Sequence, residues 1–256
     1  MYTDEELDQL EQEEHGLTEE AFAVLLLLLG LTKEAVATEV ASFFHKYGTE
    51  GVVSYQAARK WVSDKDHTKR MFALFSYIGT TFDGSFVDFE HNFRNHLRTI
   101  VNSELEFFGI DPSLIDIDKI LDMAWGVDKA TWNDRLWQYY DKWTTVLSND
   151  LKQSFLRRDK LVDVLEDINK RFVSMEKILW RLYVTETTAV GSLARKEIFK
   201  ELGIKKYRFY AREDERTCEL CGSLHGLIFP ISAYEVGVTA SPIHGHCRCW
   251  EVPIMD

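Results

Sequence analysis

The sequence predicts a mainly α N-terminal helical body followed by a small α+β C-terminal domain. Apolar residues recur at helical spacing over most of the first 200 residues. The chain has only four prolines, two of them within its last fifteen residues. All four cysteines lie within the last forty residues, where short alternating segments replace the helical pattern. We expect three parts: an acidic N-terminal arm (1–20), a helical body (21–200) and a C-terminal domain (205–256).

The first twenty residues are strongly acidic. They contain nine Asp or Glu and no Lys or Arg, which predicts a solvated arm and is unlike the basic start of a signal peptide. The whole chain has a net charge of −12, which disfavours a protein that wraps nucleic acid, because phosphate binding depends on cationic contacts. The longest apolar run, Ala21–Leu29, has nine residues. A membrane helix needs roughly 20, so we expect a buried helix and no membrane contact.

A series of helices is expected in the first half of the chain. Residues 18–30 begin with a threonine and two acidic residues that suit a helix start, and residues 33–47 end before Gly48. Two shorter helical patterns follow between Tyr55 and Ile78, with a break near residues 63–66. Residues 79–85, which contain two glycines, predict a turn. The next helix, 86–108, has one apolar face formed by Phe89, Phe93, Leu97, Ile100 and Leu105.

A short helix (116–124) and two long helices are expected next. Residues 132–151 are rich in Trp and Tyr at helical spacing. Apolar residues then step by four and three without a miss, at Leu161, Leu165, Ile168, Phe172, Met175, Leu179 and Leu182. This stripe predicts a core helix in an antiparallel bundle, and a homo-oligomeric coiled coil is the alternative. The same register places Glu186 at a core position, where a carboxylate is costly unless it is paired.

The C-terminal domain is expected to be a small α+β unit. Gly203 ends the helices, and short strands are predicted at 207–210, 227–229 and 249–252. A domain of about 50 residues is near the size at which a metal is needed for stability. Its six basic and seven acidic residues nearly balance, so the domain has no strong electrostatic footprint for DNA.

The cysteines form two close pairs with histidines beside the second pair. Cys218-x-x-Cys221 is separated by 25 residues from Cys247-x-Cys249, and two histidines precede the second pair, His244 and His246. This clustering predicts a clamp on one tetrahedral metal ion, most naturally zinc, which staples the domain. Two disulfides or four free thiols are the alternatives. Disulfides need an oxidising compartment, and nothing in the sequence indicates one.

The ligand set has two versions. One consists of Cys218, Cys221, His244 and Cys247. The other uses all four cysteines, although Cys247-x-Cys249 would point its side chains to opposite faces if the segment were extended. The candidate metal ligands are therefore Cys218, Cys221, His244, Cys247 and Cys249. Either set fills all four positions of a tetrahedral ion, so the zinc would be structural, with no open position for water.

Several segments together resemble a known family. They are 211–221 (Ala-Arg-Glu-Asp-Glu-Arg-Thr-Cys-Glu-Leu-Cys), 224–229 (Leu-His-Gly-Leu-Ile-Phe) and 242–249 (Pro-Ile-His-Gly-His-Cys-Arg-Cys). In order, spacing and position they resemble the C-terminal domain of the phage Mu F-like minor head proteins, also called head morphogenesis proteins. Weaker resemblances lie upstream, at 132–137 and at 185–187, so the likeness covers roughly residues 130–256. Where the family has an Arg before Thr-Glu, this chain has Val184, so Glu186 needs another partner, for which Arg181 is a candidate.

The resemblance implies a structural minor capsid protein of a tailed phage or prophage. Such a protein would be associated with the portal and the inner head, and would act in head morphogenesis and in DNA packaging or ejection. Its expected partners are the portal protein and other head proteins, with transient DNA contact as a further option. Its expected location is the capsid interior near the portal, and the host cytoplasm during assembly.

Two other classes of function are alternatives: an enzyme or toxin-like effector of the transferase type, and a zinc module that binds nucleic acid. No phosphate loop, dinucleotide motif or nucleophile elbow occurs in the sequence. We therefore expect no enzyme and no catalytic residues. Asp214 and Arg216, beside Cys218, are expected to form a structural ion pair that orders the cysteine turn.

Overall fold

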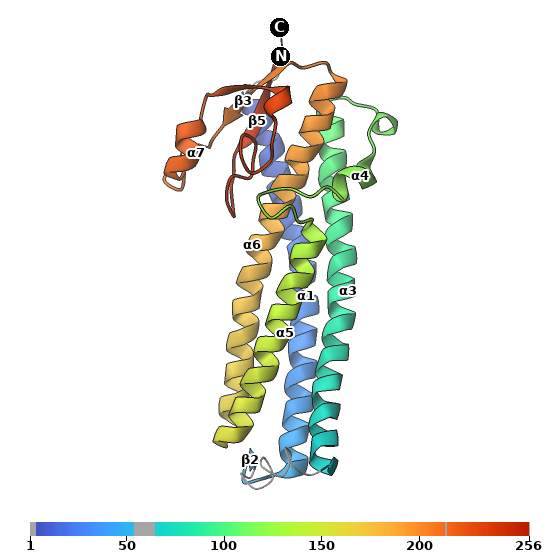
Figure 1. Cartoon of the computed structure of the whole chain (residues 1–256), viewed down its shortest axis with the longest axis vertical. Coiled ribbons are helices and arrows are strands. Elements are labelled where there is room, and N and C mark those ends of the chain that lie inside the picture. Colours follow the sequence, from blue (N-terminus) through green and yellow to red (C-terminus); the bar gives the residue numbers. More distant parts are fainter. Residues whose placement is uncertain (1–3, 54–64, 213, 256) are drawn as a thin grey trace. The chain divides into compact units, whose positions relative to one another are not determined.

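The computed structural model describes residues 4–53, 65–212 and 214–255. Most of these residues are helical. The helices are α1 (Asp4–Tyr47), α3 (Lys65–Phe107), α4 (Ile117–Leu121), α5 (Trp132–Arg157), α6 (Leu161–Glu201) and α7 (Glu219–Leu224), with two short 3-10 turns, η1 (Pro112–Leu114) and η2 (Ile231–Ala233) (Figure 1). Contacts divide the chain into two compact units. Unit 1 comprises Met1–Phe22, Asn92–Arg135 and Trp180–Asp256, and unit 2 comprises Ala23–His91 and Leu136–Leu179.

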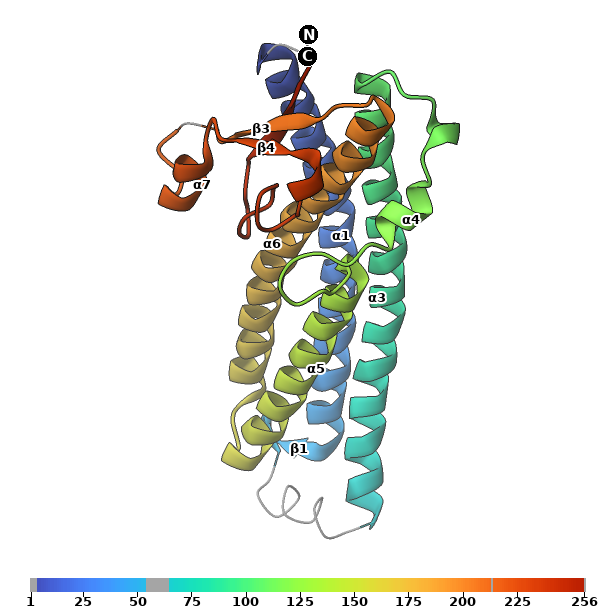
Figure 2. The same ribbon diagram turned by 45° about the horizontal axis from the view of Figure 1, so that its top comes forward.

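Unit 2 is a bundle of four helical segments, which belong to α1, α3, α5 and α6 and run side by side in both ribbon views (Figures 1 and 2). Aromatic rings join them. Phe43 of α1 lies 5.5 Å from Phe155 of α5 between ring centroids. Phe82 of α3 packs at 4.5 Å against Trp143 of α5 and at 5.8 Å against Phe172 of α6. The apolar stripe of α6 thus forms the expected core helix of a bundle. The residues of this stripe from 168 onward are buried.

Helix α3 runs through the segment where a turn was expected. Residues 79–85 are helical, so that prediction is wrong. Phe82 and Phe86 are fully buried, and their burial outweighs the weak helix propensity of Gly79 and Gly84. The hydroxyl of Thr80 donates to the carbonyl of Ser76 at 2.9 Å, so this polar side chain is satisfied within the helix. The expected helical patterns between Tyr55 and Ile78 fall partly on residues 54–64, which lie outside the described residues.

Helix α1 ends where Gly48 predicts. A hairpin with a two-residue turn follows, in which β1 (Gly48–Thr49) pairs antiparallel with β2 (Val52–Val53). The turn residues Glu50 and Gly51 have φ values of 56° and 74°, the left-handed conformation that hairpin turns of this kind require. A side chain at position 48 would collide with the carbonyl oxygen of Phe44, so glycine is needed at this exit from the helix.

Unit 1 contains the predicted α+β region. Three short strands form an antiparallel sheet in the order β4–β3–β5, with β3 at Lys206–Tyr210, β4 at Ile228–Pro230 and β5 at Trp250–Ile254. The pairing of β3 with β4 is visible in Figure 2. The fold class expected from the sequence is confirmed: a mainly α body with a small α+β C-terminal part. The boundaries of the three predicted domains stay predictions.

The acidic start of the chain is part of unit 1. Residues 4–20 belong to α1, and Leu10, Glu14 and Thr18 are buried at spacing four along one helix face. The expectation of a solvated arm is therefore wrong for this stretch. Charge composition alone suggested solvation, but Leu10, Glu14 and Thr18 form an inward stripe that the acidic residues around them obscure.

One helix in the described part of the chain is long and apolar enough to cross a membrane by length and composition: α1, over Asp8–Tyr47. Core helices of other proteins pass the same test. Leu25, Leu29 and Val36 are buried, as in a core helix, whereas Leu27 and Leu31 are 70% and 65% exposed.

Candidate metal centre

The first cysteine pair lies on a tight turn that begins α7. Cys218 is the N-cap of this helix, and its sulfur accepts a hydrogen bond from the backbone N–H of Cys221 at 3.3 Å. The backbone N–H of Gly222 donates to the carbonyl of Cys218 at 2.9 Å. Amide hydrogen bonds to sulfur stabilise the thiolate form, and they lower the pKa of Cys218. This turn is the local geometry expected for one half of a metal clamp.

Asp214 holds this turn in place, with a partner other than the one expected. Its carboxylate accepts two hydrogen bonds from the guanidinium of Arg248, each at 2.6 Å. It also accepts one from the backbone N–H of Arg216, at 2.8 Å. The predicted side-chain pair between Asp214 and Arg216 is therefore wrong. Because Arg248 lies between Cys247 and Cys249, the ion pair connects the two cysteine segments directly.

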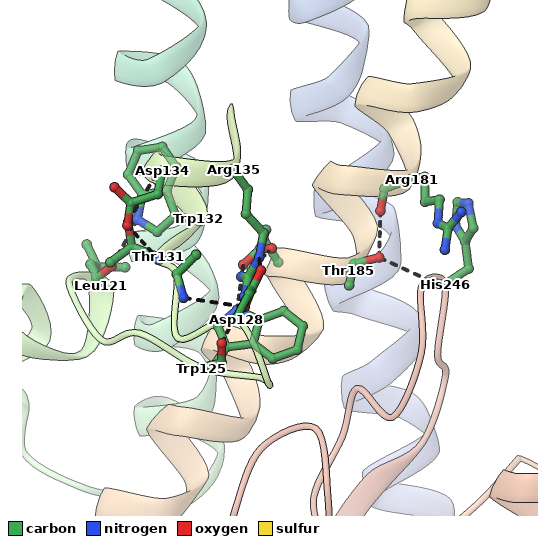
Figure 3. Close-up of polar contacts among 12 residues, drawn as sticks. Leu121, Trp125, Asp128, Thr131, Trp132, Asp134, Arg135, Arg181, Thr185 and His246 are labelled. Atoms are coloured by element: carbon green, nitrogen blue, oxygen red, sulfur yellow. Dashed lines mark hydrogen bonds and ion pairs between the residues drawn. The ribbon is translucent and has the colours of Figure 1, made fainter. Parts of the chain in front are cut away.

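The second cysteine pair lies on a loop that is fastened to α6. His246 has a φ of 61°, which lets the loop reverse just before Cys247. The backbone N–H of His246 donates to the hydroxyl of Thr185 at 3.2 Å, and that hydroxyl donates to the carbonyl of Arg181 at 2.6 Å (Figure 3). The hydroxyl of Thr188 approaches the carbonyl of Cys247 at 3.4 Å. The helix therefore fixes the loop that presents this cysteine pair.

The predicted ligand atoms converge. They form two overlapping groups, in each of which all ligand atoms lie within 4.8 Å of one another: Cys218, Cys221 and His244, and Cys221, Cys247 and Cys249. Two thiolates on one tetrahedral zinc ion stand about 3.8 Å apart, given Zn–S bonds of about 2.3 Å. The sulfur atoms of Cys221 and Cys247 are 3.8 Å apart. The sulfur of Cys221 lies 3.2 Å from Nε2 of His244. These groups could hold a metal ion.

Cys249 also comes close to Cys221. Residues 247–249 precede β5 and are not part of a strand, so the side chains of Cys247 and Cys249 do not alternate across a sheet. Spacing therefore gives no reason to prefer His244 over Cys249 as a ligand. Five candidate atoms surround four coordination positions, and the choice between the two ligand sets stays a prediction. All four cysteines are free thiols in the structure.

The crowded sulfur atoms favour a cation. Burial, followed by the charge of Cys247, raises the pKa of Cys221 to about 12. The thiol of Cys249 donates to Cys247 and lowers the pKa of Cys247 to about 6, while the pKa of Cys249 itself is raised. These shifts express one constraint: adjacent buried thiolates repel each other, so without a cation they do not all ionise. A divalent metal ion removes that constraint.

Glu186 lies in the core of unit 1, as its register predicts, but its partner is Arg135 and not Arg181. The carboxylate is 1% exposed and accepts hydrogen bonds from Arg135 Nη1, at 2.9 Å, and from Trp125 Nε1, at 2.7 Å. The same guanidinium reaches Asp128 at 2.5 Å and the carbonyl of Trp125 at 2.8 Å (Figure 3). Burial raises the pKa of Glu186, and Arg135 opposes that shift.

The start of α5 positions Arg135. The backbone N–H of Asp134 donates to the hydroxyl of Thr131 at 3.1 Å, and the carboxylate of Asp134 accepts from the backbone N–H of Thr131 at 2.9 Å, a capping box (Figure 3). Trp132 is anchored by a hydrogen bond from its ring N–H to the carbonyl of Leu121, at 2.9 Å. Arg135 is the Arg of the Trp132–Trp137 motif, so that motif was the available signal for the partner of Glu186.

The cysteine cluster lies in a segment that is similar to a known family. Residues 146–252 match the family described as Phage Mu protein F like protein. This match confirms the resemblance expected from the cysteine and histidine motifs.

One relative matches a part of the chain. An uncharacterized protein of Haemophilus influenzae is 31% identical over 120 residues, which are 46% of this chain and 26% of that protein. The match therefore spans about a quarter of the length of that relative. No solved structure matches the chain significantly.

Proposed function

We propose that this protein is a structural minor head protein of a tailed phage or prophage, that it associates with the portal and the inner head, and that it acts in head morphogenesis. The family match over residues 146–252 carries this proposal. The matched segment includes the long helix α6 and the whole Cys/His cluster that is fastened to it. Participation in DNA packaging or ejection, and transient contact with DNA, belong to the same proposal.

A single structural zinc ion completes the proposed C-terminal fold. Thiolate sulfur and imidazole nitrogen are the donors that zinc prefers, and four such donors close the coordination sphere. The 3.8 Å separation of the Cys221 and Cys247 sulfurs supports zinc, because it is the separation a tetrahedral ion of this size requires. The ion would link α7, the loop before β5 and, through Thr185 and Thr188, helix α6.

The proposed role is not catalytic. The carboxylates of Glu186 and Asp214 are both held in ion pairs with arginines. Buried or paired carboxylates that fasten segments together are typical of structural roles, and they are poor candidates for proton transfer unless a substrate reaches them.

The proposal is tested in the phage or prophage that encodes the protein. Deletion of the gene should reduce the yield of DNA-filled heads, and a wild-type copy should restore it. Mass spectrometry of purified heads should detect the protein at low copy, and cross-linking in those heads should join it to the portal protein. A Ser223→Ala copy, which changes an exposed residue of α7, should complement as well as wild type does.

Two results would contradict the proposal. The first is an unchanged yield of filled, infectious heads after deletion. The second is absence of the protein from purified heads while it accumulates in the infected cell, which would favour an effector role. If the protein is found in heads but cross-links only to the shell protein, the head role stands and the portal contact is wrong.

A further inference from the structure

Four charged side chains meet in the interior of unit 1. Glu14 of α1, Glu104 of α3, Arg195 of α6 and Glu251 of β5 are 8%, 0%, 5% and 0% exposed. Among the described residues, no other place buries three carboxylates around one cation. Sequence reasoning did not find this cluster, because its members lie on four different elements and form no local motif.

Arg195 is the centre of the cluster. Its Nη2 contacts Oε1 of Glu104 closely and lies 3.7 Å from Oε2 of Glu14, and its Nη1 lies 3.4 Å from Oε2 of Glu251. Gly191, one turn earlier on α6, leaves room for this arrangement, since a Cβ there would stand 3.3 Å from Oε1 of Glu104. One guanidinium therefore forms ion pairs with three buried carboxylates.

Glu251 has three hydrogen-bond donors besides Arg195. It accepts from the backbone N–H of Ser241 at 2.6 Å, from the hydroxyl of Tyr234 at 3.0 Å and from the hydroxyl of Ser192 at 3.2 Å. Arg195 is the one cation among these four side chains, and three carboxyl groups surround it. Glu14 and Glu104 therefore have no further cation inside the cluster.

Glu14 and Glu104 do not have such partners. Oε1 of Glu14 and Oε2 of Glu104 are buried, and neither has a hydrogen-bond donor. A fully ionised cluster would place a net charge of −2 on side chains of residues that are at most 8% exposed, where little solvation compensates the charge. A water molecule in the adjoining cavity, of about 50 Å³, could donate a hydrogen bond to Glu14 but would not neutralise this charge.

We propose that Glu14 and Glu104 share one proton at neutral pH, and that this proton fastens residues 4–22 of α1 to the rest of unit 1. The proton lies on one carboxyl group and is donated to the other, which turns two repelling acceptors into a hydrogen-bonded pair. Glu104, left ionised, keeps its ion pair with Arg195. Glu14, left neutral, tolerates full burial without a cation of its own.

The electrostatic surroundings agree with this geometry. Burial, followed by the charge of Glu104, raises the pKa of Glu14 well above its ordinary value, although Arg195 opposes the shift. Burial also raises the pKa of Glu104. The titratable and charged groups that face the pair or line its cavity are Arg195, Glu251, Tyr234, Glu11, His15 and Arg248. Of these, Arg195 is the one cation in contact with either carboxylate.

A bound metal cation is a poorer explanation of the excess charge. The groups of described residues that could hold a metal are the two Cys/His groups, and these carboxylates do not form a third. The guanidinium of Arg195 already occupies the centre between them. A proton needs no additional space and places a donor between two unpartnered acceptors.

The shared proton makes the stability of unit 1 depend on pH. Because the folded pKa is raised, the folded protein holds one proton more than the unfolded chain at any pH between the ordinary and the raised values. The contribution is fully present below the ordinary carboxyl pKa and is lost as pH rises through the raised pKa. Within that window the unfolding equilibrium constant should increase about tenfold per pH unit for one linked proton.

The proton itself can be observed in the wild-type protein. Infrared spectroscopy at about pH 7, with and without ¹³C-labelled glutamate, should show the carbonyl stretch of a protonated Glu carboxyl group, shifted by the label. The band should disappear in both Glu14→Gln and Glu104→Gln. It should persist in Glu13→Gln, a matched control because Glu13 is an exposed neighbour on the same helix. Absence of a labelled carboxyl band in the folded wild type would overturn the proposal, and this test requires no variant to fold.

The linkage is tested by urea unfolding from about pH 6 to about pH 9. Wild type and Glu13→Gln should lose stability as pH rises. Glu14→Gln, which keeps a hydrogen-bond donor in the position of the protonated carboxyl group, should abolish the component due to this pair and remain folded. The same pH dependence in Glu14→Gln and wild type would contradict the proposal. So would a rise in wild-type stability on addition of Na⁺ or K⁺ that Glu14→Gln abolishes, because that result identifies a cation in place of the proton.

Discussion

The two units bury different kinds of side chain. In unit 2 the buried polar groups, among the residues the structure describes, are the hydroxyls of Thr32 and Ser154, and the rest of the interior is aromatic and aliphatic. In unit 1 the interior also includes Glu14, Glu104, Glu186, Arg195 and Glu251, and beside them the Cys/His cluster. One interior is held by apolar burial, and the other also depends on charges, protons and a proposed metal ion.

This difference predicts different sensitivities. Apolar burial responds to lost volume and hardly to pH or chelators. Paired charges, shared protons and thiolate ligands respond to pH, to chelation and to the loss of a single partner. Unit 1 is therefore the part of the chain where solution conditions can change the structure, and it contains most of the features that point to function.

The largest effect is expected from removing the residue that both groups of candidate ligands share. Cys221→Ser should abolish binding of the proposed zinc and unfold the segment around α7 and β5, because binding of a structural zinc contributes about 10–16 kcal/mol in small domains. Wild type purified under reducing conditions should contain one zinc per chain by elemental analysis. A chelator should unfold the segment around α7 and β5, which should appear as a change in the melting curve, and should leave unit 2 folded.

Single replacements of the other cysteines distinguish the ligand sets. If the four cysteines bind the ion, Cys249→Ser should weaken zinc binding as much as Cys218→Ser does, and His244→Ala should not. If His244 is the fourth ligand, the two outcomes are exchanged. Zinc-free wild type with a melting curve insensitive to chelation would show that the cluster is not a metal site.

A smaller but substantial effect is expected in unit 2. Phe172→Ala removes a ring that is 1% exposed and lies 4.8 Å from Trp143 between centroids, so it should destabilise the protein by about 3–5 kcal/mol. Val173→Ala, at the neighbouring 41% exposed position, should change stability by less than about 0.5 kcal/mol. Equal losses for the two variants in urea unfolding would show that α6 is not buried along its predicted stripe.

Hydrophobic periodicity was enough to predict the α6 helix of unit 2. The α6 stripe repeats strictly over seven apolar positions, so burial follows from the helical period alone. The failure at residues 79–85 has the opposite cause. There, Gly79 and Gly84 indicated a turn, but Phe82 and Phe86 continue the buried face of α3 across both glycines. Local propensity is a weak signal where tertiary burial of large side chains decides the outcome.

The candidate site was predictable in part. Clustering of Cys and His in the sequence located the candidate metal centre, because its candidate ligands form two pairs that are local in sequence. The partners of Glu186 and Asp214 were predicted wrongly, since Arg135 and Arg248 lie 51 and 34 residues away in sequence. Arg181 and Arg216 were preferred because they are near in sequence, although the Trp132–Trp137 motif contains Arg135 and so offered a signal for the partner of Glu186.

The smallest expected effect tests Arg135 as the partner of Glu186. Glu186→Ala leaves Arg135 Nη1 and Trp125 Nε1 without their buried acceptor and should cost about 2 kcal/mol, because Asp128 still compensates the guanidinium. Arg181→Ala should have little effect on this network. The free energies of unfolding of Glu186→Ala, of Arg135→Ala and of the double variant together give the coupling energy between the two side chains. A coupling near zero would mean that Glu186 is not held by Arg135.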